Sequence, residues 1–153
     1  MSLIYENLKK LNIVLPKAPA PAANYVPFVI SGNIIFISGQ ISMIDGNLIT
    51  GKVGVDIKIS EGIKAARACG LAIIAQLNEA TDQKLDKVKK IVKLGGFVNC
   101  DSNFQNQPEI INGASDLMVE VFGNAGKHSR FAVGSNSLPR NVSVEIDAIA
   151  ELK

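Results

Sequence analysis

Two long stretches of this chain carry apolar residues at helical spacing, and one strand-forming stretch separates them. The first stripe is formed by Ile63, Ala66, Gly70, Leu71, Ile74 and Leu77. The second is formed by Ile110, Ala114, Leu117 and Val121. Each stripe predicts a helix that buries one side against a neighbouring layer. Ser60 suits the start of the first helix, Pro108 suits the first turn of the second, and Gly123 suits its end.

The remaining apolar runs are typical of strands. Residues 26–30 and 34–37 flank a Gly32-Asn33 turn and predict a β-hairpin, with Pro27 favouring an edge position for its first strand. Residues 88–98 predict a third strand, in which Gly95-Gly96 indicates a bulge or a close approach of another chain segment. Residues 128–135 predict the next strand. Residues 142–152 alternate apolar and polar side chains, as a strand with one buried face does.

The expected order is therefore hairpin, helix, strand, helix, strand, strand. This order favours an α+β fold in which a mixed sheet carries both long helices on one face. So short a chain leaves the other face of the sheet bare. Because a bare apolar face is normally buried, we expect a closed homo-oligomer.

The N-terminal segment differs from the rest of the chain. Leu3, Ile4, Leu8 and Leu11 recur at helical spacing, and a stretch rich in proline and alanine follows them. We therefore divide the chain into an N-terminal helix and connector, residues 1–24, and a single domain, residues 25–153. A length of 153 residues fits one domain with an adequate core.

Composition excludes several classes of protein. A formal net charge of +2 gives no electrostatic basis for binding nucleic acid, and no apolar run reaches the roughly 20 residues of a membrane helix. Cys69 and Cys100 lack the spacing of zinc ligands, so we expect no zinc site, and two cysteines in a chain with an adequate core favour reduced thiols and a cytoplasmic location.

Arg130 is the most informative polar residue. It lies on a predicted strand with Ala132 and Gly134 as its neighbours on the same face. A guanidinium above small residues can bind a carboxylate, because its planar fork donates two parallel hydrogen bonds. Glu145 lies on the polar face of the next strand, where it could serve a hydrolytic step.

Three motifs resemble one family in their order and spacing. They are ISGQ at residues 37–40, the run from Lys90 to Val98, and Arg130 followed by Leu138-Pro139 and by VEI at residues 144–146. Together they resemble the RidA/YjgF family of reactive-intermediate deaminases, and residues 111–117 with the long N-terminus resemble its longer-chain branch. The resemblance implies a chorismate-mutase-like fold and a barrel-like homotrimer with sites in clefts between subunits.

The resemblance also implies an activity. Family members hydrolyse 2-imino acids and their enamine tautomers, such as 2-aminoacrylate, to 2-oxo acids and ammonia without a cofactor or metal. Arg130 matches the residue that binds the carboxylate, and Glu145 matches the acid near the attacking water. The matched residues that line the site are Tyr25, Ser38 and Gly39.

Two positions depart from the family pattern. Ser102 occupies the place of an active-site asparagine, although Asn103 is adjacent, and Ala132 replaces a common cysteine. These departures favour, as an alternative function, a non-catalytic trimer that binds small 2-oxo acids. Endoribonuclease activity, which is also attached to family names, is a third alternative, and the near-neutral charge speaks against it.

Structural roles also remain open for single residues. Arg130 could form a salt bridge, Glu145 could pair with Arg140 or Lys93, and His128 could serve a loop or a cap.

Overall fold

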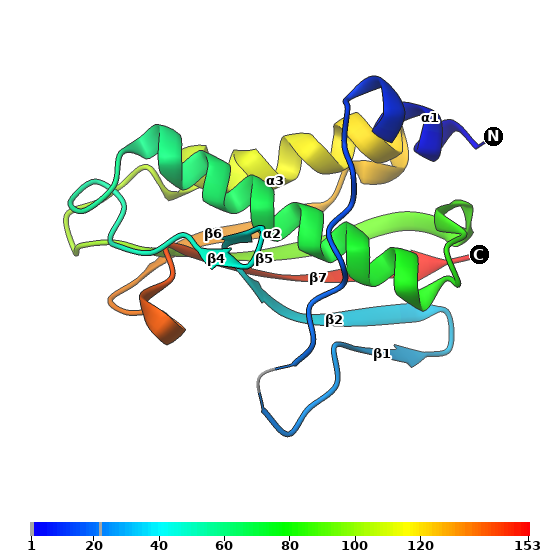
Figure 1. The fold of residues 1–153 in the computed structure, drawn as a ribbon, viewed down its shortest axis with the longest axis horizontal. Helices are drawn as coiled ribbons and strands as arrows, with labels where there is room; N and C mark the ends of the chain where they lie inside the picture. The colour runs from blue at the N-terminus through cyan, green and yellow to red at the C-terminus, as the bar shows by residue number, and fades with distance from the viewer. Residues whose placement is uncertain (1, 22) are drawn as a thin grey trace.

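The structure of the chain is a computed structural model, which describes residues 2–21 and 23–153 (Figure 1). The main elements in order are α1 (Leu3–Lys10), β1 (Phe28–Ser31), β2 (Ile34–Ile41), α2 (Ile59–Ala80), β5 (Val88–Asn99), α3 (Gln107–Phe122), β6 (Ser129–Ser135) and β7 (Val144–Leu152). A small hairpin, β3 (Met43–Ile44) and β4 (Asn47–Leu48), interrupts the region between β2 and α2. The expected order of hairpin, helix, strand, helix, strand and strand is confirmed.

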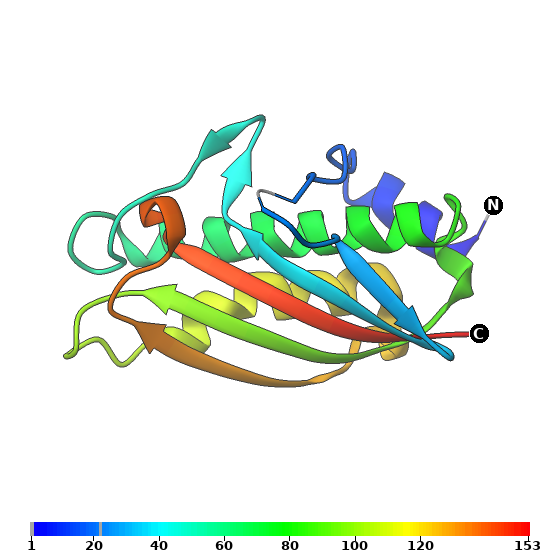
Figure 2. The same cartoon turned by 90° about the horizontal axis from the view of Figure 1, so that it is seen from below.

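The five long strands form one mixed sheet in the order β1-β2-β7-β5-β6. Only β5 and β6 pair in parallel, and the other neighbours are antiparallel. Both long helices lie behind this sheet in Figure 2, on a single face. The core lies between the helices and that face, so the expected α+β architecture is confirmed.

The two long helices pack closely because glycines lie where they meet. A Cβ at Gly113 of α3 would collide with the carbonyl oxygen of Ile63 on α2. A Cβ at Gly70 of α2 would lie 2.9 Å from Cδ2 of Leu117. Glycine lowers helix propensity, so its presence in two helix interiors reflects this close contact.

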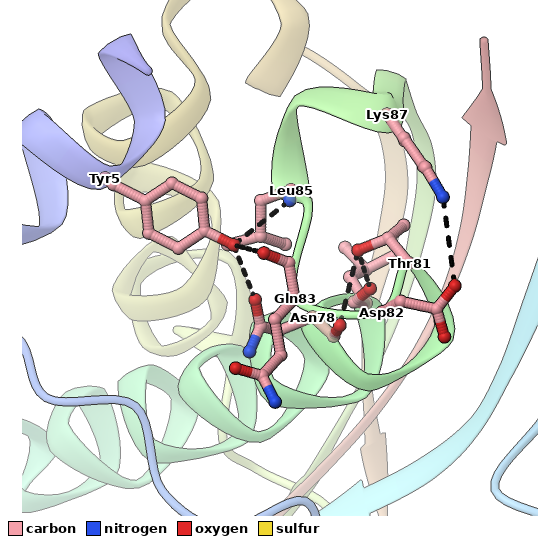
Figure 3. A network of polar contacts seen from close by, with 8 residues as sticks. Tyr5, Asn78, Thr81, Asp82, Gln83, Leu85 and Lys87 are labelled. Carbon is pink, nitrogen blue, oxygen red and sulfur yellow. Dashed lines mark hydrogen bonds and ion pairs between the residues drawn. The ribbon is translucent and has the colours of Figure 1, made fainter. Parts of the chain in front are cut away.

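Helix α1 is attached to the rest of the domain by polar contacts. The Asn7 side chain donates a hydrogen bond to the Val121 carbonyl of α3, at 3.0 Å. The Tyr5 hydroxyl accepts a hydrogen bond from the Leu85 backbone N–H, and it lies 2.8 Å from Asn78 Oδ1 and 2.6 Å from the Gln83 carbonyl (Figure 3). These contacts hold α1 against the ends of both long helices.

The connector after α1 runs across α2 in Figure 1. Gln76 of α2 is 1% exposed, and its amide donates to the Pro19 carbonyl at 2.7 Å. This hydrogen bond satisfies a buried polar group and holds the connector on the helix.

Several local expectations need correction. Helix α2 begins at Ile59 rather than after Ser60. The Glu61 carboxylate accepts a hydrogen bond from the backbone N–H of Lys58, which makes Lys58 the residue that caps the helix. Gly95-Gly96 forms no bulge, since both residues pair in regular register. The alternative reading of a close approach is confirmed, because a Cβ at Gly96 would lie 2.7 Å from the Ile111 side chain.

Strand β2 contains a bulge that the sequence did not indicate. Ile37 pairs with Ala148 and Gln40 pairs with Ile146, so β2 uses three steps where β7 uses two. The extra residue falls at Ser38-Gly39. A bulge of this kind bends the strand and redirects its side chains.

In residues 2–21 and 23–153, no helix is both long and apolar enough to cross a bilayer. Cys69 and Cys100 are both free and buried, and burial raises the pKa of the Cys69 thiol.

We predict that Gly113→Ala destabilises the protein even though alanine is the better helix former. The added methyl group must displace the α2 backbone, and overpacking of this kind typically costs about 1–3 kcal/mol. Urea denaturation should show a lower midpoint with an unchanged slope. The neighbouring exposed residue offers the control, because Asn112→Ala should leave the midpoint unchanged or raise it slightly. A Gly113→Ala variant as stable as the wild type would contradict the close contact.

Candidate functional site

Glu145 lies on the face of the sheet that the helices leave open. It is on β7, where it pairs with Ile41 of β2 on one side and Phe97 of β5 on the other. Its carboxylate covers Gly39, since a Cβ at that position would collide with Glu145 Oε1. The bulge in β2 therefore places the backbone of residue 39 directly beside the carboxylate.

Tyr25 and Ser38 lie beside Gly39 and Glu145. Together with Gly39 and Glu145 they line a hollow of about 210 Å³, to which the connector contributes Pro19. Ser38 shapes this hollow, because its hydroxyl donates to the Val26 carbonyl at 2.7 Å and its backbone N–H donates to the Pro27 carbonyl at 2.9 Å. We call Tyr25, Ser38, Gly39 and Glu145 the acidic half-site.

The Glu145 carboxyl is half-buried and lacks a cationic partner in one chain. No ion pair or hydrogen bond joins its side chain to another residue of 2–21 or 23–153, so the pairings with Arg140 and Lys93 are not formed. Burial raises its pKa above the ordinary value, and the negative charge of Asp147 adds to the effect. A raised pKa makes the carboxylate a stronger base, which favours its acceptance of a proton from water.

Arg130 lies on the opposite face of the sheet from Glu145. It is on the edge strand β6 opposite Leu94, a residue fully buried beneath the helices. One guanidinium nitrogen, Nη1, donates to Ser115 Oγ at 3.0 Å, and Nη2 donates to the Pro108 carbonyl at 3.2 Å. A single chain therefore does not bring Arg130 and Glu145 together.

The other matched residues follow Arg130 along the helix face of β6. Ala132 is half-buried opposite Gly96, and Gly134 comes next on the same face. A hollow of about 410 Å³ lies beside Gly134 and includes Ser102 from the loop after β5. Asn103 is exposed in the same loop but does not line the hollow. Neither Arg130 nor Ala132 lines this hollow, so Ser102 is not brought to Arg130 by the lining. We call Arg130 and Ala132 the cationic half-site.

Ser115 and His128, which the sequence did not assign to a site, determine how Arg130 is held. The Gly126 carbonyl lies 2.6 Å from His128 Nδ1, so that nitrogen must carry the proton in the neutral ring. His128 Nε2, 2.9 Å from Ser115 Oγ, then accepts the serine proton. The hydroxyl lone pairs are thereby turned toward Arg130. His128 does bond a loop carbonyl as expected, and it also orients the partner of the guanidinium.

Ser115 could not have been identified from spacing alone. It lies outside the buried stripe of α3, and the resemblance of residues 111–117 to the longer-chain branch assigns it no role. Only the position of β6 beside α3 brings it to Arg130. Three of the five guanidinium N–H groups remain for a ligand, and no carboxylate within the described residues bonds to Arg130.

Side chains of the types that bind metals are dispersed in the described part of the chain. No group of three or more histidine, cysteine, aspartate or glutamate side chains gathers there with the geometry to hold an ion. The free guanidinium donors of Arg130 suit carboxylate binding, and the half-buried carboxyl of Glu145 suits proton transfer.

Comparison with known proteins identifies one family. Residues 6–152 match the model of the family described as "YjgF/chorismate_mutase-like, putative endoribonuclease". The Trypanosoma cruzi protein TCP17 is 47% identical over 95% of this chain and 92% of its own length. A 2-iminobutanoate/2-iminopropanoate deaminase of Dermatophagoides farinae is 32% identical over 92% of this chain and 95% of its own.

Solved structures agree with this match. The Agrobacterium tumefaciens protein Atu1372 superposes with a TM-score of 0.92 at 45% identity, covering 99% of this chain and 93% of that one. Escherichia coli TdcF with bound serine superposes with a TM-score of 0.63 at 26% identity, covering 90% and 94%.

We predict that Glu145→Gln stabilises the protein, and more so at high pH. Since the pKa of the folded carboxyl is raised, the native state binds this proton more tightly than the unfolded state does, and the wild type loses stability as pH rises above about 4.3. The amide side chain of the variant does not ionise, so the variant does not lose stability in this way as pH rises. Thermal unfolding at pH 8 should show a midpoint about 2 °C higher for the variant, and the difference should shrink at pH 4.

Asp147→Asn serves as the graded comparison, because Asp147 is the lesser cause of the shift. It should give a smaller gain in the same direction. A Glu145→Gln variant that is less stable than the wild type at pH 8 would contradict the raised pKa.

Proposed function

Because the chain belongs to the YjgF/chorismate-mutase-like family, we propose that it hydrolyses small 2-imino acids to 2-oxo acids and ammonia. The observation that carries the proposal is the pair of half-sites. One offers a guanidinium with free donors and no carboxylate partner among residues 2–21 and 23–153, and the other offers a half-buried carboxyl with a raised pKa. The mite deaminase is a relative named for this reaction, and TdcF is a neighbour with a bound amino acid.

The two half-sites would be joined between copies of the chain. The open face of the sheet exposes large apolar side chains, including Phe36 at 47%, Val133 at 42% and Phe97 at 38%. An exposed patch of this kind is normally buried in an assembly. We propose that a homotrimer covers this face and brings β6 of one subunit, with Arg130, beside the acidic half-site of the next.

In such a cleft Arg130 would bind the substrate carboxylate. Its Nη1 and Nη2 are already held by Ser115 and Pro108, so little side-chain entropy remains to be lost on binding. The fixed guanidinium would hold the neighbouring C=N carbon at one point. Orientation of this kind can supply much of the rate of a hydrolysis that has few steps.

Glu145 would then move the protons. Its carboxylate accepts a proton as water adds to the C=N carbon of the protonated imine, which gives a carbinolamine with a new C–O bond. The carboxylic acid returns this proton to the nitrogen. As the C–N bond breaks, the carbinolamine hydroxyl gives its proton to the Glu145 carboxylate and becomes the carbonyl of the 2-oxo acid. The departing ammonia then takes that proton and leaves as ammonium. The raised pKa of Glu145 suits both halves of this exchange.

Non-catalytic binding of small 2-oxo acids is the second candidate. The specific observation in its favour is Ala132, which gives no polar side-chain atom beside Arg130. Ser102 adds to it, since a hydroxyl is a poorer hydrogen-bonding group than the amide at this place in the family. This alternative predicts that pyruvate raises the melting temperature although ammonia is never released.

We predict that both half-sites are needed for deaminase activity. With 2-aminoacrylate generated in situ, Arg130→Ala should lower kcat/KM about 10- to 100-fold, the value of a charged hydrogen bond. Glu145→Gln should lower kcat about 10²- to 10⁴-fold. The control is Arg67→Ala, which removes a cation paired with Glu120 at 3.0 Å and should leave the rate unchanged. Ammonia release no faster than the spontaneous reaction would reject the proposal.

A mixed assembly tests whether one active site draws on two subunits. Equal amounts of Arg130→Ala and Glu145→Gln chains are unfolded together and refolded. In a random trimer about one quarter of the clefts should then combine an intact arginine with an intact glutamate, and about a quarter of wild-type activity should return. Each variant refolded alone is the control. If no activity returns in the mixture, the two residues do not act across a subunit boundary.

A further inference from the structure

A third hollow lies on the outer side of α2, and it adjoins the acidic half-site, with which it shares Pro19, Ile41 and Met43. It measures about 680 Å³, within the range of small-molecule sites. The connector forms one wall with Leu15 and Pro19, the turn after β3 forms another, and α2 forms the floor. Neither Glu145 nor Arg130 lines it.

The floor of this outer hollow changes from cationic to apolar along α2. Lys64 and Arg67 lie at one end, and Ala68, Leu71 and Ala72 follow one to two turns later. These positions are three, four, seven and eight residues from Lys64, so they share one side of the helix. Eight residues of helix span about 12 Å. The floor is thus long enough for an extended aliphatic chain with its polar end at Lys64.

The charges around the outer hollow favour an anion. Arg67 is neutralised by Glu120, at 3.0 Å. Lys17 and Lys64 remain, and their side chains form no hydrogen bond or ion pair with any described residue, while Asp45 is the one acidic residue in the lining. The local balance is therefore positive.

The outer hollow is also formed before any ligand arrives. Gln76 holds the Pro19 carbonyl at 2.7 Å, and Pro16 and Pro19 restrict the connector on either side of Lys17. A wall that is already fixed loses little entropy when a ligand binds.

We propose that the outer hollow binds an aliphatic monoanion of about eight carbons, with its charged end at Lys64 and its chain along Leu71. Such a site would adjoin the proposed deaminase cleft but use other charged groups, since neither Lys64 nor Lys17 lines the acidic half-site, and it does not depend on the deaminase activity.

Isothermal titration calorimetry of the full chain with octanoate, butanoate and octan-1-ol tests the site. Octanoate should bind saturably at one per chain and at least about tenfold more tightly than butanoate, because four fewer methylene groups are buried by the shorter acid. Lys64→Glu should weaken octanoate about fivefold and leave octan-1-ol unchanged. Lys127→Glu makes the same charge change at an exposed residue outside the hollow and should alter neither ligand.

Three results would overturn the proposal. The first is a titration in which octanoate shows no saturable binding. Lys64→Glu and Lys127→Glu could have equal effects, which would show only a response to net charge. Arg130→Ala could abolish octanoate binding, which would assign the acid to the cationic half-site instead. Retention of octanoate binding in Arg130→Ala keeps this test independent of the deaminase activity.

Discussion

The placement of both long helices on one face of the sheet determines where every candidate side chain lies. Successive residues of a strand point to opposite faces, so one covered face sorts them into two groups. Arg130 and Ala132 fall on the helix side of β6, whereas Glu145 falls on the open side of β7. Even the unpaired state of the Glu145 carboxyl follows from this arrangement, because the guanidinium that could neutralise it lies across the sheet.

The same asymmetry links assembly to chemistry. An open face that carries Phe36, Phe97 and Val133 is a natural contact surface between copies of the chain. Covering that face would also bury Glu145 further and would exclude water from its surroundings. The desolvation that already raises its pKa would then increase. Subunit contact and proton transfer would thus depend on one surface in the proposed trimer.

The connector lines both the acidic half-site and the outer hollow on α2. Pro19 lines the acidic half-site and also the outer hollow on α2, and Ile41 and Met43 are likewise shared. A single hydrogen bond from Gln76 holds this wall between them. The N-terminal extension therefore contributes to the shape of the candidate site rather than serving only as a link to α1.

Much of the fold could be predicted because its signals are local. The apolar stripes of α2 and α3 and the alternation in β7 arise from the periods of helix and strand, which neighbouring residues alone reveal. The bulge at Ser38-Gly39 could not be predicted, since it depends on the register between β2 and β7. The same is true of the Ser115–His128–Arg130 contacts, which join α3 to β6.

The sequence by itself determined the type and order of the elements, the one-sided sheet, and the residues Arg130 and Glu145 as the groups to examine. Only the tertiary structure decided that these two groups face opposite sides of a single chain, that Gly39 lies beneath the carboxylate, and that Ser115 holds the guanidinium. The physical reason is the range of the forces involved. Periodicity and turn preference act between neighbours in sequence, whereas register, bulges and side-chain hydrogen bonds depend on segments that meet only when the chain has folded.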